Sequence, residues 1–190
     1  ATSFNQSLNF NTSNVTNMVS LFRQATSFNQ SLNFDTSSVT NMNNMFSGAT
    51  AFNGTLTFSD TSSVTEMDSM FNGATSFDQS LNFNTSSVTD MSYMFQRATS
   101  FDQLLNWNIT SVTEMVSMFN DVTLSTINYN AILIYWENGL QNAFPNGSGY
   151  TPTISITFGG SKYTGGGVAA TAKASLINNF NWTITDGGIA

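Results

Sequence analysis

The stretch ATSFNQSLNFDTSSVTNMNNMFSG, residues 25–48, decides the fold because it is one copy of a unit that fills residues 1–121. Five copies follow one another, and the third contains one extra residue, Ser59. Self-similarity with a period of about 20–50 residues is typical of solenoids, in which each coil buries its apolar face against its neighbours. We therefore predict five stacked coils. The copies are 1–24, 25–48, 49–73, 74–97 and 98–121.

Two kinds of apolar spacing occur inside each copy. The first half alternates apolar and polar residues around S-L-N-F, which indicates a short strand, and the second half has helical spacing through V-T-x-M-x-x-M-F. These patterns predict an α/β repeat solenoid with one short strand and one short helix per 24-residue coil. All apolar columns should point inward together. In the first copy they begin at Phe4, Leu8, Phe10, Val15, Met18, Leu21 and Phe22.

A column of acidic residues runs through the later copies at the start of the expected helices. Ser63 precedes one such helix and Glu66 follows three residues later, which fits a capping box that satisfies two backbone donors. The same position holds Asp90 and Glu114 in the next two copies. Stacked one coil apart, Glu66, Asp90 and Glu114 could attract calcium. Because the capping role explains these acids without an ion, we predict no metal site, and these three residues are the candidates if one exists.

Asparagine and aspartate fill two further columns, which begin at Asn5 and Asn11. These side chains could face a ligand such as a glycan, or they could form ladders that satisfy backbone groups at the turns. Several of the asparagines also lie in N-x-S/T sequons, the acceptor sequence for N-linked sugar. The candidate glycosylation sites are Asn11, Asn53, Asn84 and Asn146.

The composition changes after residue 121, and the remaining segment, 122–190, is expected to cover the last coil. Its pattern predicts the element order helix, strand, helix, strand. The expected elements are a helix at 124–143, a strand at 153–158, a helix at 168–178 and a strand at 181–185.

Charge and composition restrict the function. The chain has a net charge of −7, only four cationic residues, no cysteine and no histidine. Zinc sites built from cysteine and histidine, thiol chemistry and histidine-based triads are thereby excluded. Four cationic residues are too few to neutralise the phosphates along a nucleic acid, and we therefore expect no nucleic-acid partner. We also expect no cofactor and no enzymatic activity, because the acids recur with the repeat instead of converging on one cleft, and no apolar run is long enough to span a membrane.

The repeat S-x-x-V-T-x-M-x-x-M-F-x-x-A-x-x-F-N/D-Q-x-L resembles that of BspA-like leucine-rich-repeat surface proteins. The C-terminal segment is also similar to one that often follows such arrays, through residues 129–136, 160–163, 172–177 and 182–188. The resemblance implies a leucine-rich-repeat-like fold and a secreted or surface-displayed protein, with adhesion or host interaction as its role. It implies no shared catalytic site, and its motif is a core motif, so it transfers no functional residue.

We therefore expect a non-catalytic extracellular surface or adhesion module that presents a polar face to a protein or glycan. The alternatives are a structural subunit of an extracellular filament or virion surface, and a carbohydrate-binding module. The corresponding location is extracellular, at a cell surface or a virion surface. The first copy starts in full repeat phase at Ala1. An uncapped first coil predicts either further repeats before it or a neighbouring subunit that covers it.

Overall fold

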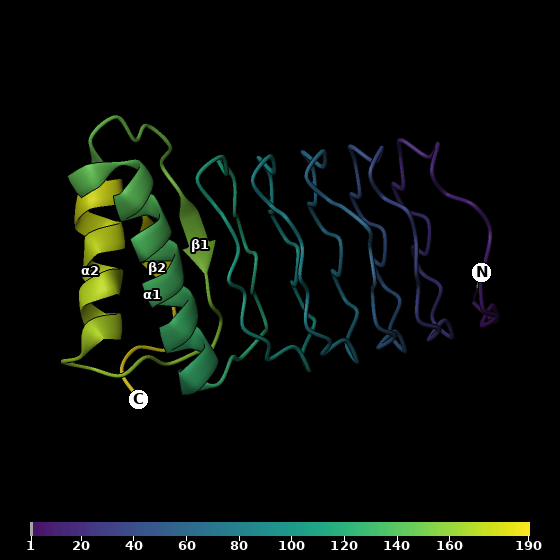
Figure 1. Ribbon diagram of the computed structural model, residues 1–190. Coiled ribbons are helices and arrows are strands. Elements are labelled where there is room, and N and C mark those ends of the chain that lie inside the picture. Colours follow the sequence, from purple (N-terminus) through teal and green to yellow (C-terminus); the bar gives the residue numbers. More distant parts are fainter. Residues whose placement is uncertain (1) are drawn as a thin grey trace.

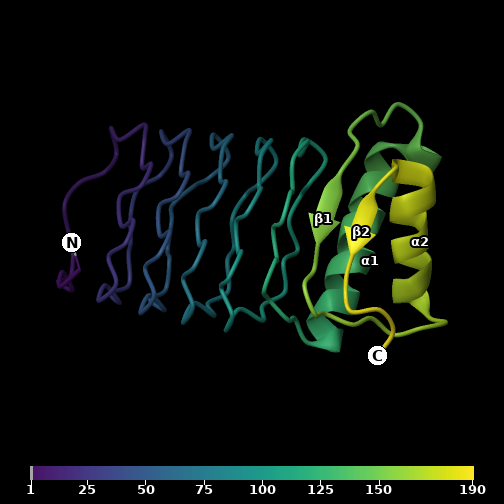
Figure 2. The same ribbon diagram turned by 180° about the vertical axis from the view of Figure 1, so that it is seen from behind.

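The computed structural model describes residues 2–190 and shows a row of coils that ends in a small packed region at the C-terminal end (Figure 1). Ala1, with which the first copy of the repeat begins, lies outside the described residues. Both helices and both strands lie in the C-terminal region, which covers one end of the row (Figures 1 and 2). The elements are α1 (Thr126–Ala143), the short 3₁₀ helix η1 (Pro145–Gly147), β1 (Ser155–Thr157), α2 (Val168–Phe180) and β2 (Thr183–Thr185).

The two strands form a two-stranded parallel sheet in which Ile156 pairs with Ile184. The helix α2 connects them, as a parallel pair requires a crossover. Along the chain, α1, β1, α2 and β2 follow one another as the pattern of residues 122–190 predicts.

The predicted α/β solenoid, with one strand and one helix in each coil, is wrong. Between residues 2 and 121 the structure has neither a helix nor a continuous strand. Each coil is a succession of turns, and neighbouring coils are joined by isolated parallel bridges such as Leu32 to Leu56 and Glu66 to Asp90. The expected strand around S-L-N-F is reduced to the single bridge at Leu32, and the expected helix is absent from every coil in this range.

Backbone hydrogen bonding explains why the M-x-x-M-F pattern does not form a helix. Alternate amides of this segment donate to the next coil, as Met42 N does to Glu66 O at 3.0 Å and Asn44 N does to Asp68 O at 3.0 Å. These donors are therefore unavailable to a helix, whose amides all bond within the same segment. The next amide, Met45 N, instead closes a tight turn onto Met42 O at 3.2 Å.

A left-handed residue in each coil also interrupts helical continuation. The residue between the two methionine positions has a positive φ in every copy, for example 56° at Ser69 and 58° at Tyr93. A single left-handed residue is incompatible with a continuing right-handed helix. Apolar residues at i, i+3 and i+4 therefore face inward from consecutive turns, and the pattern is the same as that of an amphipathic helix.

The core is a set of aromatic stacks that run along the row of coils. Phe46, Phe71 and Phe95 stack with ring centroids 5.4 and 5.6 Å apart, and a second column stacks beside them through Phe52 and Phe77 at 5.6 Å. The predicted inward orientation is confirmed for these two columns in the middle coils, where the rings are fully buried, whereas Leu56 and Phe58 of the third copy are only half-buried. The first coil differs.

Phe10 was expected in the core, but 53% of its surface is exposed. Among residues 2–190, its ring stacks only on Phe34, at 5.6 Å. Leu21 is likewise exposed, and Phe4, Leu8 and Val15 of the same copy are half-buried, so the first coil covers its apolar columns least.

The C-terminal region joins the last coil through both backbone and aromatic contacts. Phe119 N donates to Thr157 O of β1 at 3.1 Å, and the rings of Phe119 and Phe158 stack at 5.1 Å. Ser161, which is fully buried, accepts a hydrogen bond from Leu124 N at 2.9 Å. These contacts fix α1 beside the last coil and so create the space between them.

Candidate functional site

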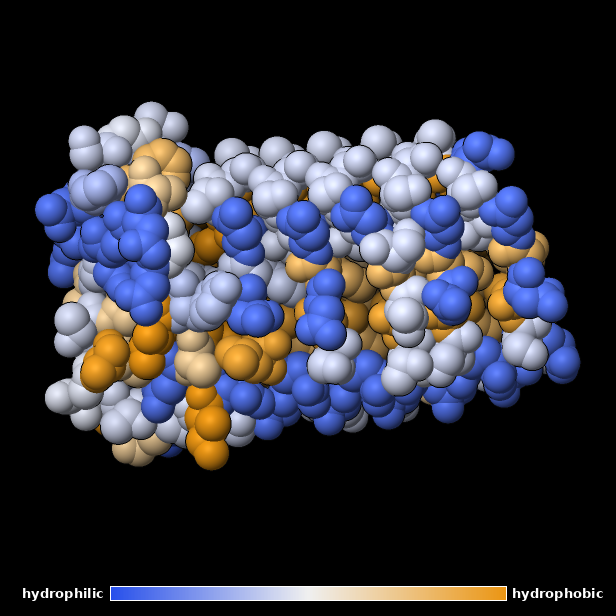
Figure 3. All heavy atoms as spheres, viewed as in Figure 1, coloured by the Kyte–Doolittle hydropathy of each residue, from blue (hydrophilic) through white to orange (hydrophobic). Residues whose placement is uncertain are grey.

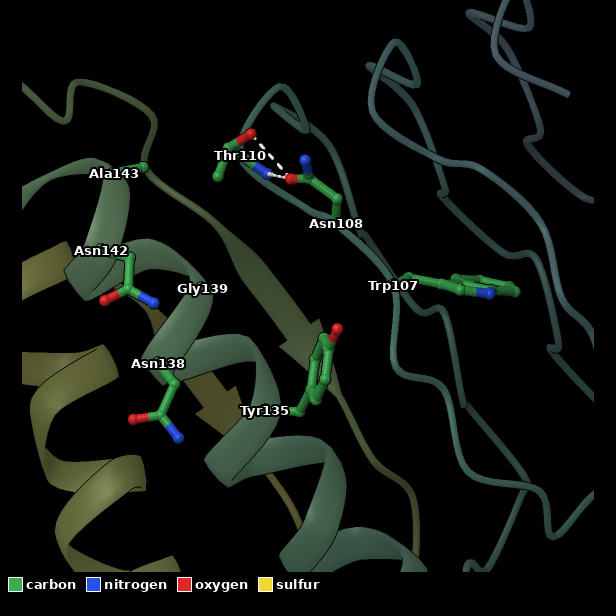
Figure 4. A pocket seen from close by; sticks show the side chains of 8 residues that line it. All are labelled: Trp107, Asn108, Thr110, Tyr135, Asn138, Gly139, Asn142 and Ala143. Carbon is green, nitrogen blue, oxygen red and sulfur yellow. Dashed lines mark hydrogen bonds between the residues drawn. The ribbon is translucent and has the colours of Figure 1, made fainter.

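A groove of about 620 Å³ lies between α1 and the last coil (Figure 4). One wall is the exposed side of α1 and the other is the turn that follows Trp107. The residues lining it are Trp107, Asn108, Thr110, Tyr135, Asn138, Gly139, Asn142 and Ala143.

The helical wall follows from the amphipathic pattern of α1. Tyr135, Asn138 and Asn142 are three and seven residues apart, which places them on one face of a helix. The opposite face packs into the core through Trp136 and Leu140, which are fully buried. Burial of one face therefore fixes which side chains line the groove.

The N-terminus of α1 is held to the coil before it in the stack. Ser125 caps the helix, since its hydroxyl accepts a hydrogen bond from Asn128 N at 3.3 Å. Asp102 Oδ1 accepts from Ser125 N at 2.7 Å and from Asn128 Nδ2 at 3.0 Å. The start of the helix is thus fixed by the last coil, and the groove-lining turns further along it have a defined position.

The coil wall is fixed by a side-chain turn. Asn108 Oδ1 accepts hydrogen bonds from Thr110 N at 3.0 Å and from Thr110 Oγ1 at 2.7 Å, as drawn in Figure 4. Trp107 points away from α1 into the coil, where its indole N–H donates to Leu81 O at 3.2 Å. Trp107 is therefore a core residue that borders the groove rather than a ligand platform.

The groove combines an aromatic ring with amide and hydroxyl groups. Tyr135 is 48% exposed, and Asn108, Asn138 and Asn142 are exposed as well. None of the eight lining residues is an Asp, Glu, Lys, Arg, His or Cys. This arrangement can bind a neutral polar ligand. It contains no pair of groups suited to general acid–base chemistry.

Sequence reasoning did not find the groove. Its helical wall lies in a segment interpreted as a cover for the last coil, and no repeated column indicates it. The available signal was the spacing of Tyr135, Asn138 and Asn142 on the polar face of the expected helix 124–143.

A second cluster is acidic and lies on the surface of the middle coils. Carboxylate oxygens of Glu66, Asp68 and Asp90 lie within 4.8 Å of one another and could hold a metal ion. Glu114, the third candidate from the sequence, is exposed and forms the next bridge along, with Asp90. The stacking of the column is therefore observed, but Asp68 completes the cluster in place of Glu114.

Asp68 has an altered acidity in this cluster. Burial of the carboxyl, followed by the negative charges of Asp90 and Glu66, raises the pKa of Asp68 above its usual value. Sequence reasoning missed Asp68 because its column otherwise holds valine, asparagine and serine. No repeated acidic column marks Asp68, and its position two residues after Glu66 does not share a face with it in the helix that the pattern predicts.

The capping boxes predicted for these acids are wrong because no helix follows Ser63 or its equivalents in the structure of residues 2–121. Asp90 instead closes a side-chain turn, in which its Oδ1 accepts from Ser92 N at 2.7 Å. Asn41 occupies the same column and accepts from Asn43 N at 2.9 Å in the same way.

Comparison with known proteins places the repeat in a family. The family described as "Mycoplasma protein of unknown function, DUF285" matches residues 1–57 and 32–132, which is more than half of the chain. The chain belongs to the DUF285 family. BspA-like repeat proteins are in this group, but no specific BspA leucine-rich-repeat family is matched. No curated protein and no solved structure matches the chain.

The DUF285 match includes the coil wall of the groove and ends within α1, before Tyr135. The helical wall therefore lies outside the matched residues. In the part of this DUF285 chain that the structure describes, neither helix combines the length and apolar character needed to cross a membrane.

One asparagine column of this DUF285 protein forms the ladder expected as one of two alternatives. Asn29 Oδ1 accepts from Asn53 N at 2.8 Å, Asn53 Oδ1 accepts from Asp78 N at 3.0 Å, and Asp78 Oδ1 accepts from Asp102 N at 2.9 Å. The other column closes turns within each coil, as Asn108 does. Both columns satisfy backbone amides of the coils.

The four predicted glycosylation sites are all exposed. Asn53 belongs to the ladder, Asn11 and Asn84 use Oδ1 to close turns, and Asn146 lies in η1 with a φ of 53°. Within residues 2–190, no hydrogen bond engages the Nδ2 group of Asn11, Asn53 or Asn84, the atom to which sugar would be attached. Glycosylation of these residues stays a prediction.

A buried polar network holds the C-terminal region together. Asp186 Oδ2 accepts hydrogen bonds from Lys173 Nζ at 2.7 Å and from the Tyr129 hydroxyl at 2.6 Å. Lys173 Nζ also lies 4.3 Å from the ring centre of Tyr163. Burial and the bond to Asp186 raise the pKa of Tyr129 far above its usual range, so its hydroxyl stays protonated and acts as a donor.

Proposed function

We propose that this chain is a non-catalytic extracellular surface module that binds a protein or glycan partner. The observation that carries the proposal is the repeated polar surface of the coils, on which the same hydrophilic side chains recur from coil to coil (Figure 3). The extracellular location and the adhesive role are also what the resemblance to BspA-like surface proteins implies.

The ladders give this surface a fixed geometry. Asn53 accepts from Gln79 Nε2 at 2.9 Å, and Asp78 accepts from Gln103 Nε2 at 2.8 Å, so these half-buried glutamines are held in register. A rigid surface loses little side-chain entropy when a partner binds. Identical groups repeated along the row also offer one partner several equivalent contacts, which raises avidity.

A bead assay tests the proposal directly. Beads coated with the folded chain should adhere to animal cells or to extracellular matrix proteins more strongly than beads coated with the heat-unfolded chain. Soluble folded chain should compete with this adhesion. Equal adhesion of folded and unfolded coatings to every cell and matrix tested would refute the proposal.

A carbohydrate-binding module is the second candidate, and the groove between α1 and the last coil favours it. Tyr135 and three asparagines supply an aromatic ring and amide groups there, which are the groups that recognise a sugar. A glycan partner would be consistent with both the surface module and the carbohydrate-binding module.

A further inference from the structure

We propose that the groove between α1 and the last coil binds a neutral oligosaccharide, with the ring of Tyr135 as its stacking surface. The inference rests on the proposed function as a surface module and names the ligand class and the site. Three asparagines, Asn108, Asn138 and Asn142, would hydrogen-bond the sugar hydroxyls.

Tyr135 is the residue that points most directly to a sugar. Its side chain stands in the gap between α1 and the last coil (Figure 4), and 48% of its surface is exposed. In residues 2–190 its hydroxyl makes no hydrogen bond within the chain. A tyrosine side chain can contact a ligand with its apolar ring while its hydroxyl remains hydrogen-bonded to water. The C–H face of a pyranose ring covers such a body while the sugar hydroxyls remain hydrated.

The amides match the hydroxyls of a sugar in the kind of hydrogen bonds that they form. Each asparagine offers an acceptor and two donors, and each sugar hydroxyl both donates and accepts. Asn108 is preorganised, because its Oδ1 is held by Thr110 N and Thr110 Oγ1. Its Nδ2 group has no partner within the described part of the chain. Preorganised groups lose less entropy on binding than mobile ones.

Charge selects a neutral ligand over an acidic one. None of the lining residues is charged, and the whole chain has a net charge of −7. A sialylated or sulfated sugar would therefore meet no cation in the groove and an unfavourable overall field. The volume of about 620 Å³ lies within the range of about 300–1,000 Å³ that small-ligand sites occupy.

Saturation-transfer NMR with defined sugars tests the inference. The probes are chitotriose, maltotriose, lactose and cellotriose, with 3′-sialyllactose as the acidic comparison. At least one neutral probe should show saturation transfer with the full chain, and 3′-sialyllactose should show less. Isothermal titration of the best probe then gives the affinity for each variant.

Two substitutions separate stacking from folding. Tyr135→Ala should weaken binding about tenfold or more, because it removes the ring, whereas Tyr135→Phe should keep affinity within about threefold. Asn142→Ala should weaken it as well. The matched control is Tyr93→Ala, which removes a tyrosine that is 40% exposed on the fourth coil, outside the groove. It should leave both binding and the thermal midpoint unchanged.

The outcomes distinguish this inference from the proposed function. If no neutral probe binds, or if binding is equal in the wild type and Tyr135→Ala, the groove is not a sugar site. Bead adhesion that survives Tyr135→Ala would then leave the surface-module proposal intact and assign the partner to the coil surface. If Tyr135→Ala keeps the fold but loses both adhesion and sugar binding, the result supports the surface-module proposal and the sugar site together.

Discussion

Phenylalanine occupies equivalent positions in successive coils, and its contribution to stability depends on how many coils flank it. Phe77 is fully buried and stacks on Phe52, Phe71 and Phe101 at 5.6, 4.1 and 6.1 Å. Within the described residues Phe10 stacks on the ring of Phe34 alone, and it is 53% exposed.

Replacing Phe77 by alanine should therefore lower the free energy of unfolding by about 3–5 kcal/mol, since it removes a ring enclosed on all sides. Phe10→Ala, the matched control, should cost about 1 kcal/mol or less, because half of the ring is already in water. Chemical denaturation of both variants measures the difference. Equal losses would contradict the stacked-ring core.

The residue-level pattern also shows what a sequence can and cannot indicate. The columns of Phe, Met and Val predict the buried side of the coils after the first one correctly, because burial depends on which positions are apolar. They do not reveal the left-handed residues, since serine, asparagine and tyrosine fill that position at Ser69, Asn44 and Tyr93. No glycine marks the break, so a helical pattern and a pair of turns look alike.

Asp68 gives a prediction with a defined pH dependence. Its pKa is raised above 3.8 in the folded state by burial and by the charges of Asp90 and Glu66. The folded state therefore binds more protons than the unfolded state between these two pKa values, and stability falls as pH rises through that window. Asp68→Asn removes this cost.

The variant should melt higher than the wild type at neutral pH, and the gain should vanish below pH 3.8. Calorimetry in EDTA measures it. A wild-type midpoint that drops when EDTA is added would show instead that the cluster of Glu66, Asp68 and Asp90 holds an ion, and Asp68→Asn would then be destabilising.

Among the elements, α1 and α2 are held to the final segment by one buried carboxylate. Asp186 accepts from Lys173 on α2 and from Tyr129 on α1, and the side chains of Lys173 and Asp186 are only 14% and 5% exposed. The sequence pattern does not indicate this role for Asp186, because its partners are 13 and 57 residues away. Contacts at such separations leave no periodic signal.

Asp186→Ala should cost about 3–5 kcal/mol, because it leaves the buried ammonium of Lys173 without a counter-charge. The exposed pair of Arg97 and Asp121, 3.6 Å apart, supplies the control. Arg97→Ala should change stability by less than about 1 kcal/mol. Thermal unfolding of the two variants compares them, and a mild effect at Asp186 would show that the network adds little to packing.

The order of elements in the C-terminal region was more predictable than the coils. Helical spacing is unambiguous in α1 and α2, because each is long enough to show several turns, and Ser125 provides a cap at the start of α1. The short strands were also expected at the right places, although β1 and β2 are each only three residues long. The groove was not predicted, because it depends on where α1 lies against the last coil.

For the whole molecule, the distribution of tight contacts predicts where a protease cuts first. The coils are linked by backbone bonds at nearly every turn, whereas the segment 144–152 around η1 is largely exposed. Limited digestion followed by mass spectrometry should therefore show the first cleavage there. Earlier cuts between residues 25 and 121 would mean that the coils open more easily than this segment.

Because of the asparagine ladder, the hydrogen bonds that join the last coil to α1 do not depend on the number of coils before it. Asp102 engages Ser125 and Asn128 with the same oxygen position that Asp78 offers to Asp102. The ends of each copy match in conformation too, since Gly73 and Arg97 have φ values of 71° and 60°. A protein that lacks residues 74–97 could thus join Gly73 to Ala98, with Leu56 of the third copy taking the place of Leu81 as the partner of the Trp107 indole. Deletion or duplication of one such stretch of gene would shorten or lengthen the reach of the molecule by about 5 Å, while equivalent residues of another copy supply the contacts.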